Sequence, residues 1–67
     1  MQKATIRDPQ FVGDDEYQVV YGVLVAHPRA GEPHLHVGRL IRTSQVVRKY
    51  KNGNFRTLNT HYKVLPS

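Results

Sequence analysis

The sequence predicts a small all-β domain, built as an antiparallel meander of four to five strands. Three observations point to this class. Residues 19–25 are a nearly continuous run of β-branched, aromatic and aliphatic side chains, interrupted by Gly22. Within residues 35–43, the apolar Leu35, Val37 and Ile41 fall on one parity, and Leu40 and Arg42 fall on the other. An Asn-Gly pair at 52–53 separates two further runs rich in β-branched and aromatic residues, which is the strongest short-range signal for a hairpin.

The chain is predicted to form one domain over residues 1–67, because a chain of this length can bury only one small core. Residues 1–16 are weakly patterned, and we expect only short strands there, with turns at Asp8-Pro9 and at residues 13–15. The meander occupies residues 17–65. Its first clear strand spans residues 17–27, in which Gly22 marks a bulge or a corner. A loop rich in proline and glycine follows at residues 28–33.

The next strand, residues 35–43, is expected to fold back on residues 17–27 and to place Val23 beside Val37. A bend near its end would let the meander curl into a small, partly open barrel of SH3-like size. The predicted core combines the apolar positions of these registers: Val19, Val23, Val25, Leu35, Val37, Ile41, Val47, Leu58, Tyr62 and Val64.

The Asn52-Gly53 pair predicts a type I′ turn at the tip of a long hairpin that runs from residue 41 to residue 64. Its strands, 45–51 and 54–64, would pair Tyr50 with Phe55 and Ser44 with His61. A short helix over residues 44–52, with Ser44 as N-cap, is the alternative. Adjacent β-branched residues at 46–47 and the length of about nine residues argue against that helix.

The charge distribution predicts an anionic partner. The net charge is +5, all five acids lie within the first 32 residues, and seven Lys or Arg follow from residue 35 onward. Such a balance favours nucleic acid, DNA or RNA, or an acidic protein surface. Basic groups interleaved with aromatic rings on one sheet face supply phosphate neutralisation and base stacking. The alternative is that these cations only protect sheet edges from aggregation. The predicted nucleic-acid-binding residues are Arg42, Arg48, Lys49, Tyr50, Lys51, Phe55, Arg56, His61 and Lys63.

No pattern in the sequence indicates catalysis, a metal site or a cofactor, so we expect a non-catalytic binding module. The His34-x-His36 pair lacks a third ligand, and Ser44 opposite His61 lacks a carboxylate to orient the imidazole. The acids at 14–16 lack the glycine-spaced pattern of a calcium loop. The chain has no cysteine, which excludes a disulfide or a cysteine-ligated zinc.

The sequence gives a default expectation for location. No stretch approaches the ~20 apolar residues that span a bilayer, and residues 1–8 contain no apolar run typical of a signal peptide. We therefore expect a cytoplasmic protein that does not bind membranes. Self-association into a homo-oligomer remains open.

Two segments carry a resemblance to known proteins. Thr-Ser-x-Val-Val at 43–47 and Thr-x-Asn-Thr-x-Tyr at 57–62 resemble a pattern in small uncharacterised all-β accessory proteins of bacteriophages and mobile elements, over roughly residues 38–65. The resemblance implies an accessory protein that acts in a host cytoplasm, on nucleic acid or by binding and inhibiting or modulating a host protein. It assigns no functional residue.

Overall fold

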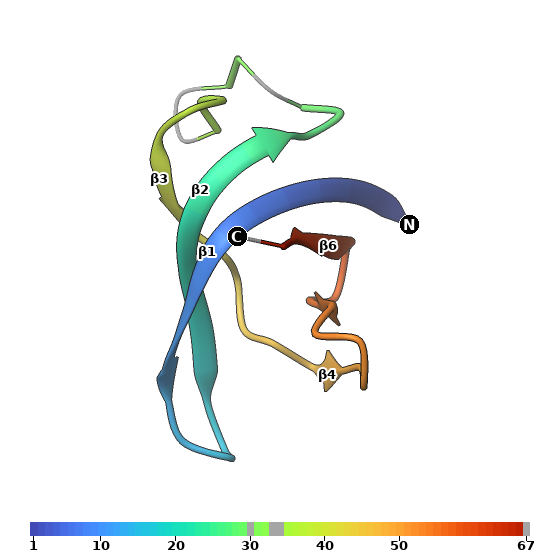
Figure 1. Ribbon diagram of the computed structural model, residues 1–67. Helices are drawn as coiled ribbons and strands as arrows, with labels where there is room; N and C mark the ends of the chain where they lie inside the picture. The colour runs from blue at the N-terminus through green and yellow to red at the C-terminus, as the bar shows by residue number, and fades with distance from the viewer. Residues whose placement is uncertain (30, 33–34, 67) are drawn as a thin grey trace.

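A computed structural model describes residues 1–29, 31–32 and 35–66 and confirms the all-β class, with no helix among these residues (Figure 1). Six strands form one sheet in the order β3-β2-β1-β6-β5-β4. The long strands β1 and β2 curve strongly, but the sheet does not close into a barrel (Figure 1). The strands are β1 (Gln2–Gly13), β2 (Gln18–Ala26), β3 (Leu40–Arg42), β4 (Arg48–Lys49), β5 (Phe55–Arg56) and β6 (Thr60–Leu65).

The sheet is mixed, so the predicted antiparallel SH3-like meander is not what forms. The first strand, β1, is central: it pairs antiparallel with β2 on one side and parallel with β6 on the other. The parallel register sets Lys3 beside His61 and Thr5 beside Lys63. A parallel pair between the two ends of the chain depends on contacts distant in sequence, which no local pattern reveals.

The prediction that residues 1–16 are weakly structured is wrong, because β1 is the longest strand and runs from Gln2 to Gly13. Its side chains alternate in burial, with Ala4 and Ile6 pointing into the core. The expected turn at Asp8-Pro9 is instead a β-bulge. Arg7 pairs with Val23 and Gln10 pairs with Tyr21, so two residues of β1 oppose only Gly22 of β2.

The expectation that Gly22 marks a bulge or corner is confirmed by this register. Gly22 is buried, and a Cβ atom built on it would lie 2.7 Å from Cδ1 of Ile6. A bulge bends a strand and increases its twist. The bulge with its facing glycine therefore lets β1 and β2 curve around the core.

The Asn52-Gly53 turn exists, but it is not type I′. The N–H of Gly53 donates to the carbonyl of Tyr50 (3.1 Å), and the N–H of Tyr50 donates to the carbonyl of Asn54 (2.8 Å). Gly53 has φ +93°, whereas Asn52 is not among the residues with positive φ. This is the three-residue loop of a type I turn followed by a G1 bulge. Within the hairpin, Arg48 pairs with Arg56 and Lys49 pairs with Phe55.

That register differs by one residue from the predicted one, and a slip of one residue moves every side chain to the opposite face. Phe55 is consequently buried at 0% exposure, whereas Leu58 is 75% exposed and Val47 45% exposed. The predicted strand 54–64 is also two strands, β5 and β6, which are joined by a turn in which the N–H of Thr57 donates to the carbonyl of Thr60.

The predicted long hairpin is therefore wrong beyond its tip. Residues 40–42 pair with β2 and not with β6. The prediction that the 35–43 segment folds back on the preceding strand is confirmed, but only Leu40–Arg42 is a strand, and Val23 lies beside Leu40 instead of Val37. Of the predicted strand 45–51, only Arg48–Lys49 forms, and the alternative helix at 44–52 does not form.

The core lies on the inner face of the curved sheet. Phe55 stacks on Tyr62 with ring centroids 5.0 Å apart, and Phe11 meets Phe55 edge-on at 5.3 Å. The predicted core residues Leu35, Ile41 and Tyr62 are confirmed, and Val64 packs at the margin. The predicted core residues that lie outside it are Val19, Val23 and Val25, which are half-buried, and Val37, Val47 and Leu58, which are exposed. The observed core is Ala4, Ile6, Val20, Leu24, Leu35, Ile41, Phe55 and Tyr62.

Candidate nucleic-acid interface

A row of basic side chains crosses four adjacent strands on the outer face of the sheet. Lys3 of β1 pairs with His61 of β6, His61 pairs with Arg56 of β5, and Arg56 pairs with Arg48 of β4. Paired residues point to the same face, and successive residues alternate. The residues that follow Lys3 and His61 and precede Arg56 are buried in the core, so the row points outward. We call Lys3, Arg48, Arg56 and His61 the basic row.

The basic row has no compensating acid within its strands. The residues of β4, β5 and β6 include no Asp or Glu. In β1, the acid is Asp8, and its carboxylate pairs with the guanidinium of Arg7 at 2.9 Å. Like charges directly opposite each other in a sheet are destabilising, so the Arg48–Arg56 pair lowers the stability of the folded protein.

The ring of Tyr50 stacks on the ring of His61, which is itself one residue of the basic row. The Tyr50 and His61 rings are nearly parallel, with an interplanar angle of 3° and centroids 5.2 Å apart. The Arg48 guanidinium carbon lies 5.4 Å from the Tyr50 ring centroid. Nε of Arg56 is buried without a hydrogen-bond partner among the described residues. We call Tyr50 and His61 the aromatic platform.

A shallow hollow of about 340 Å³ lies beside the platform. Its basic groups are Lys3, His61 and Lys63, and the hydroxyl of Thr5 and the amide of Asn54 complete its polar lining. Oδ1 of Asn54 accepts a hydrogen bond from the N–H of Val64 at 3.0 Å, which fixes the amide. Among the described residues that line it, none is acidic. The hollow has the charge and the donors that a phosphate or a sugar-phosphate group requires.

Five of the nine predicted site residues are brought together on the outer face, and four are not. Arg42 lies on β3, at the sheet edge opposite β4. Lys49 points to the other face, where its ammonium group lies 4.6 Å from the Phe11 ring centroid. Lys51 is exposed in the turn at the hairpin tip. Phe55 is fully buried, so its predicted role as a stacking surface is wrong. The five that gather are Arg48, Tyr50, Arg56, His61 and Lys63.

Sequence reasoning missed Lys3, Thr5 and Asn54. Lys3 and Thr5 join the site only because β1 pairs in parallel with β6. The alternation of residues 3–7 between polar and apolar was the available signal for β1, but it does not indicate which strand lies beside it.

The structure separates Ser44 from His61, which the sequence predicts to be cross-strand neighbours. His61 pairs with Arg56 and Lys3, so it is not the cross-strand neighbour of Ser44. His36 is exposed, and His34 lies outside the described residues. Within the described ranges, no three His, Asp or Glu side chains gather as metal ligands.

Of the acids at 14–16, Asp14 shapes the β1–β2 turn. Oδ1 of Asp14 accepts hydrogen bonds from the N–H groups of Tyr17 (3.0 Å) and Glu16 (2.9 Å). These bonds, that from Tyr17 being the larger effect, lower the pKa of the Asp14 carboxyl. Asp14 thus stabilises the turn.

Comparisons with protein-family models, with curated proteins and with solved structures found no match. In the described part of the chain, no helix is long and apolar enough to cross a membrane.

Proposed function

We propose that this protein binds single-stranded nucleic acid through the basic row, the aromatic platform and the adjoining hollow. The observation that carries the proposal is the position of the basic row. Protection of sheet edges would place cations on β3 and β4, which are the edge strands. Arg48 lies on the edge strand β4, but Lys3 and Arg56 lie on interior strands, where edge protection gives no reason for them.

The aromatic platform favours nucleic acid over an acidic protein surface. Single-strand binding combines a positively charged track for the phosphates with rings on which bases stack. The basic row crosses four strands at a spacing of about 4.8 Å, so it provides roughly 15 Å of positive surface. The Tyr50 and His61 rings and the guanidinium of Arg48 are planar groups of the kind that stack on bases.

The test is fluorescence anisotropy with a labelled oligonucleotide across a range of salt concentrations. Contacts to three or four phosphates predict that log affinity falls with log salt with a slope of roughly −2 to −3. Arg48→Gln should weaken binding and reduce the magnitude of that slope by about 0.7. Arg42→Gln is the matched control, because it removes the same charge from an exposed strand position at the opposite edge of the sheet.

Two outcomes would overturn the proposal. One is the absence of oligonucleotide binding at low salt. The other is an equal loss of affinity in Arg42→Gln and Arg48→Gln, which would mean that net charge alone is responsible. DNA and RNA oligonucleotides of the same sequence, measured side by side, identify the preferred polymer.

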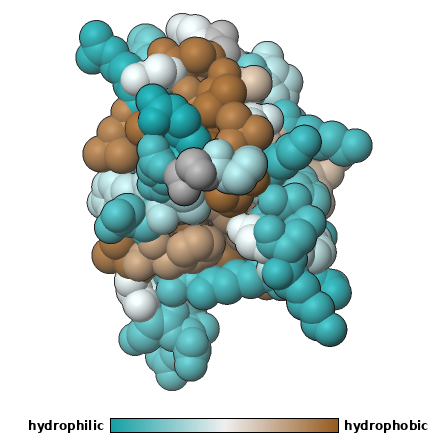
Figure 2. Space-filling model, viewed as in Figure 1, coloured by the Kyte–Doolittle hydropathy of each residue, from teal (hydrophilic) through white to brown (hydrophobic). Residues whose placement is uncertain are grey.

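A second candidate is an accessory protein that binds and modulates a host protein in the cytoplasm. It is favoured by apolar side chains on the outer face over β2 and β3, where Val23 pairs with Leu40 and Leu40 is 67% exposed. Hydrophobic residues gather over these strands on the face that Figure 2 shows. Leu40→Ser should abolish capture of a host protein in nuclease-treated lysate, whereas Arg48→Gln should leave that capture intact.

A further inference from the structure

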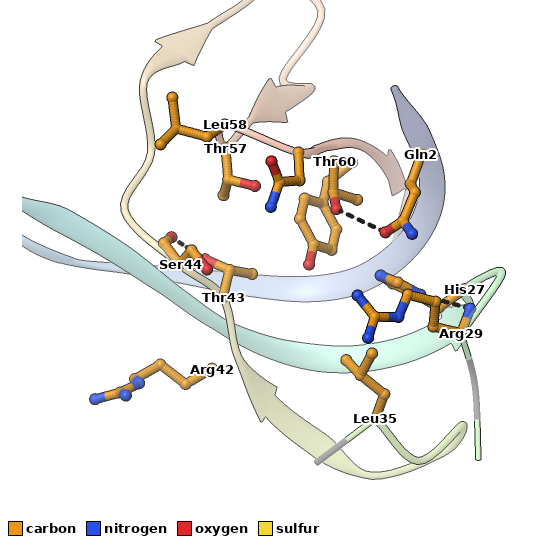
Figure 3. Close-up of a pocket in the computed structure, with 12 residues that line it drawn as sticks. Gln2, His27, Arg29, Leu35, Arg42, Thr43, Ser44, Thr57, Leu58 and Thr60 are labelled. Atoms are coloured by element: carbon orange, nitrogen blue, oxygen red, sulfur yellow. Dashed lines mark hydrogen bonds between the residues drawn. The ribbon is translucent and has the colours of Figure 1, made fainter. Parts of the chain in front are cut away.

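A second polar hollow, of about 210 Å³, lies at one end of the sheet, on the inner side (Figure 3). Three of its hydroxyl residues are almost completely buried: Thr57 is 3% exposed, Tyr62 4% and Thr60 5%. Their side chains nevertheless line the hollow, together with Gln2 and Arg29. Among the described residues that line it, none carries a carboxylate. It is smaller than the roughly 300–1,000 Å³ typical of sites for drug-sized ligands, so its ligand must be small.

We propose that this hollow binds a phosphoryl group, carried either by a free phosphate compound or by the end of a nucleic-acid strand. Arg29 supplies the positive charge. Its guanidinium points into the hollow, whereas that of Arg42 points away (Figure 3). Nε of Arg29 donates to the Glu32 carboxylate at 2.8 Å in an exposed ion pair, and this bond does not use the two terminal nitrogens of the guanidinium. A guanidinium held in this way matches two phosphate oxygens.

The hydroxyl groups supply further donors to the ligand. Oγ1 of Thr60 meets Oε1 of Gln2 at 3.5 Å, a separation long enough to exchange readily for a stronger acceptor. Burial raises the pKa of the Tyr62 phenol, so its O–H stays protonated and able to donate at neutral pH. Thr43, also on the lining, is already committed: its hydroxyl accepts from the N–H of Val20 and donates to the carbonyl of Ser44.

The hollow and the basic row meet at the same end of the sheet. Gln2 and Thr60 pair with each other and line the hollow, and the next residues, Lys3 and His61, pair and point to the outer face. A strand lying along the basic row can therefore round this end and place its terminal phosphate against Arg29. That version rests on the proposed function, whereas binding of a free phosphate compound does not.

The experiment is a titration of the whole chain, followed by amide chemical shifts in NMR, with inorganic phosphate and with ribose 5-phosphate at constant ionic strength. We expect saturable shifts that centre on the hollow. Arg29→Gln should weaken binding by about tenfold or more, because it removes a charge-assisted pair. Tyr62→Phe should weaken it by a few-fold while keeping the ring that stacks on Phe55. Arg42→Gln, which changes the charge on the rim, should leave the affinity unchanged.

Absence of binding up to about 50 mM phosphate compound, a concentration that fills even a weak site, would overturn the inference. Equal weakening by Arg29→Gln and Arg42→Gln would also overturn it. Oligonucleotides with and without a terminal phosphate then distinguish the two sources. A preference for the phosphorylated oligonucleotide that Arg29→Gln abolishes identifies a strand end, whereas phosphate binding without that preference identifies a free compound and leaves the proposed function to its own test.

Discussion

The outer face of this sheet has two halves that share one core but differ in chemistry. The basic half covers β4, β5, β6 and the first residues of β1. The other half covers β2, β3 and the end of β1, and we call it the apolar half because Val12 pairs there with Val19 and Val23 with Leu40, although Arg42 lies on it beside Tyr21. Both halves contribute inner-face residues to the core: Phe55 and Tyr62 come from the basic half, and Val20, Leu24 and Ile41 come from the apolar half. Packing of the core therefore requires neither outer pattern, and the difference indicates that the halves meet different surroundings.

The boundary between the halves coincides with the bulge in β1. Before the bulge, β1 contributes Lys3, Thr5 and Arg7 to the outer face, and after it the outer positions include Val12. The sheet tolerates an unfavourable Arg48–Arg56 opposition only in the basic half. Local features that weaken a fold are most often found at functional sites. The basic half thus has a cost in stability that the proposed nucleic-acid binding would explain, and the apolar half has no like-charge pair of this kind.

The largest effect should come from removing the core that both halves share. Phe55→Ala should destabilise the protein by about 3–5 kcal/mol, because it empties a fully buried site between Phe11 and Tyr62. Urea unfolding followed by circular dichroism measures this change. Leu58→Ala is the control: at 75% exposure it should stay within about 0.5 kcal/mol of the wild type. The reverse ranking would mean that the hairpin has the type I′ register.

Phe55 and Leu58 also explain how far the fold could be predicted from the sequence. The β-branched runs and the Asn-Gly signal identified an all-β chain and a turn at the correct place. The loop length was not readable, because Asn-Gly suits a two-residue turn and also a three-residue loop with Gly53 in the left-handed region. The additional loop residue shifts the register by one, and this shift determines which of Phe55 and Leu58 is buried.

The candidate site was predictable to the same extent. Arg48, Tyr50, Arg56, His61 and Lys63 were identified from their shared basic and aromatic character in the acid-free half of the chain. Lys3 was not, because its place beside His61 depends on a parallel pairing between strands nearly sixty residues apart. Local periodicity determines which residues share a face of one strand, but not which strands are neighbours.

The next largest effect on stability should come from Gly22, which lies opposite the β1 bulge at the boundary between the two halves. Gly22→Ala should cost about 1–3 kcal/mol, because the added Cβ would lie 2.7 Å from Cδ1 and 2.8 Å from Cγ1 of Ile6 in a packed core. Ile6→Val, which removes Cδ1, should recover part of that loss in the double variant. A double-mutant cycle by urea unfolding measures the coupling. Strictly additive effects would show that Gly22 is required for some reason other than its contact with Ile6.

A smaller effect, on affinity and not on folding, should separate the two halves directly. Tyr50 and Tyr21 are both half-buried tyrosines on the outer face, one in the basic half and one in the apolar half. Tyr50→Leu should lower oligonucleotide affinity by about 1–3 kcal/mol and leave the salt slope unchanged, because stacking releases no counterions. Tyr21→Leu should leave both unchanged in the same anisotropy assay. Equal losses would mean that the ligand contacts both halves.

The smallest effect should be on the pH dependence of the unfolding free energy at alkaline pH. It tests whether Tyr62 stays buried in the shared core when a residue of the basic half is changed. Burial raises the pKa of Tyr62 above its ordinary value of 10.0, so the folded state holds this proton more tightly than the unfolded state. Its contribution to stability is then fully present below pH 10 and is lost as pH rises through the folded-state pKa. Tyr62→Phe has no such proton, so its stability should decline less between about pH 9 and pH 12.

Because lysines and other tyrosines titrate in the same range, the informative quantity is the difference in unfolding free energy between wild type and Tyr62→Phe at each pH. A difference that does not change with pH would place the Tyr62 phenol in solvent. The effect of Tyr62→Phe can also be measured in a protein that already carries Arg48→Gln. If that effect depends on pH in the wild-type background but not in the Arg48→Gln background, the basic half is needed to keep Tyr62 buried, and the two faces of β6 are not independent.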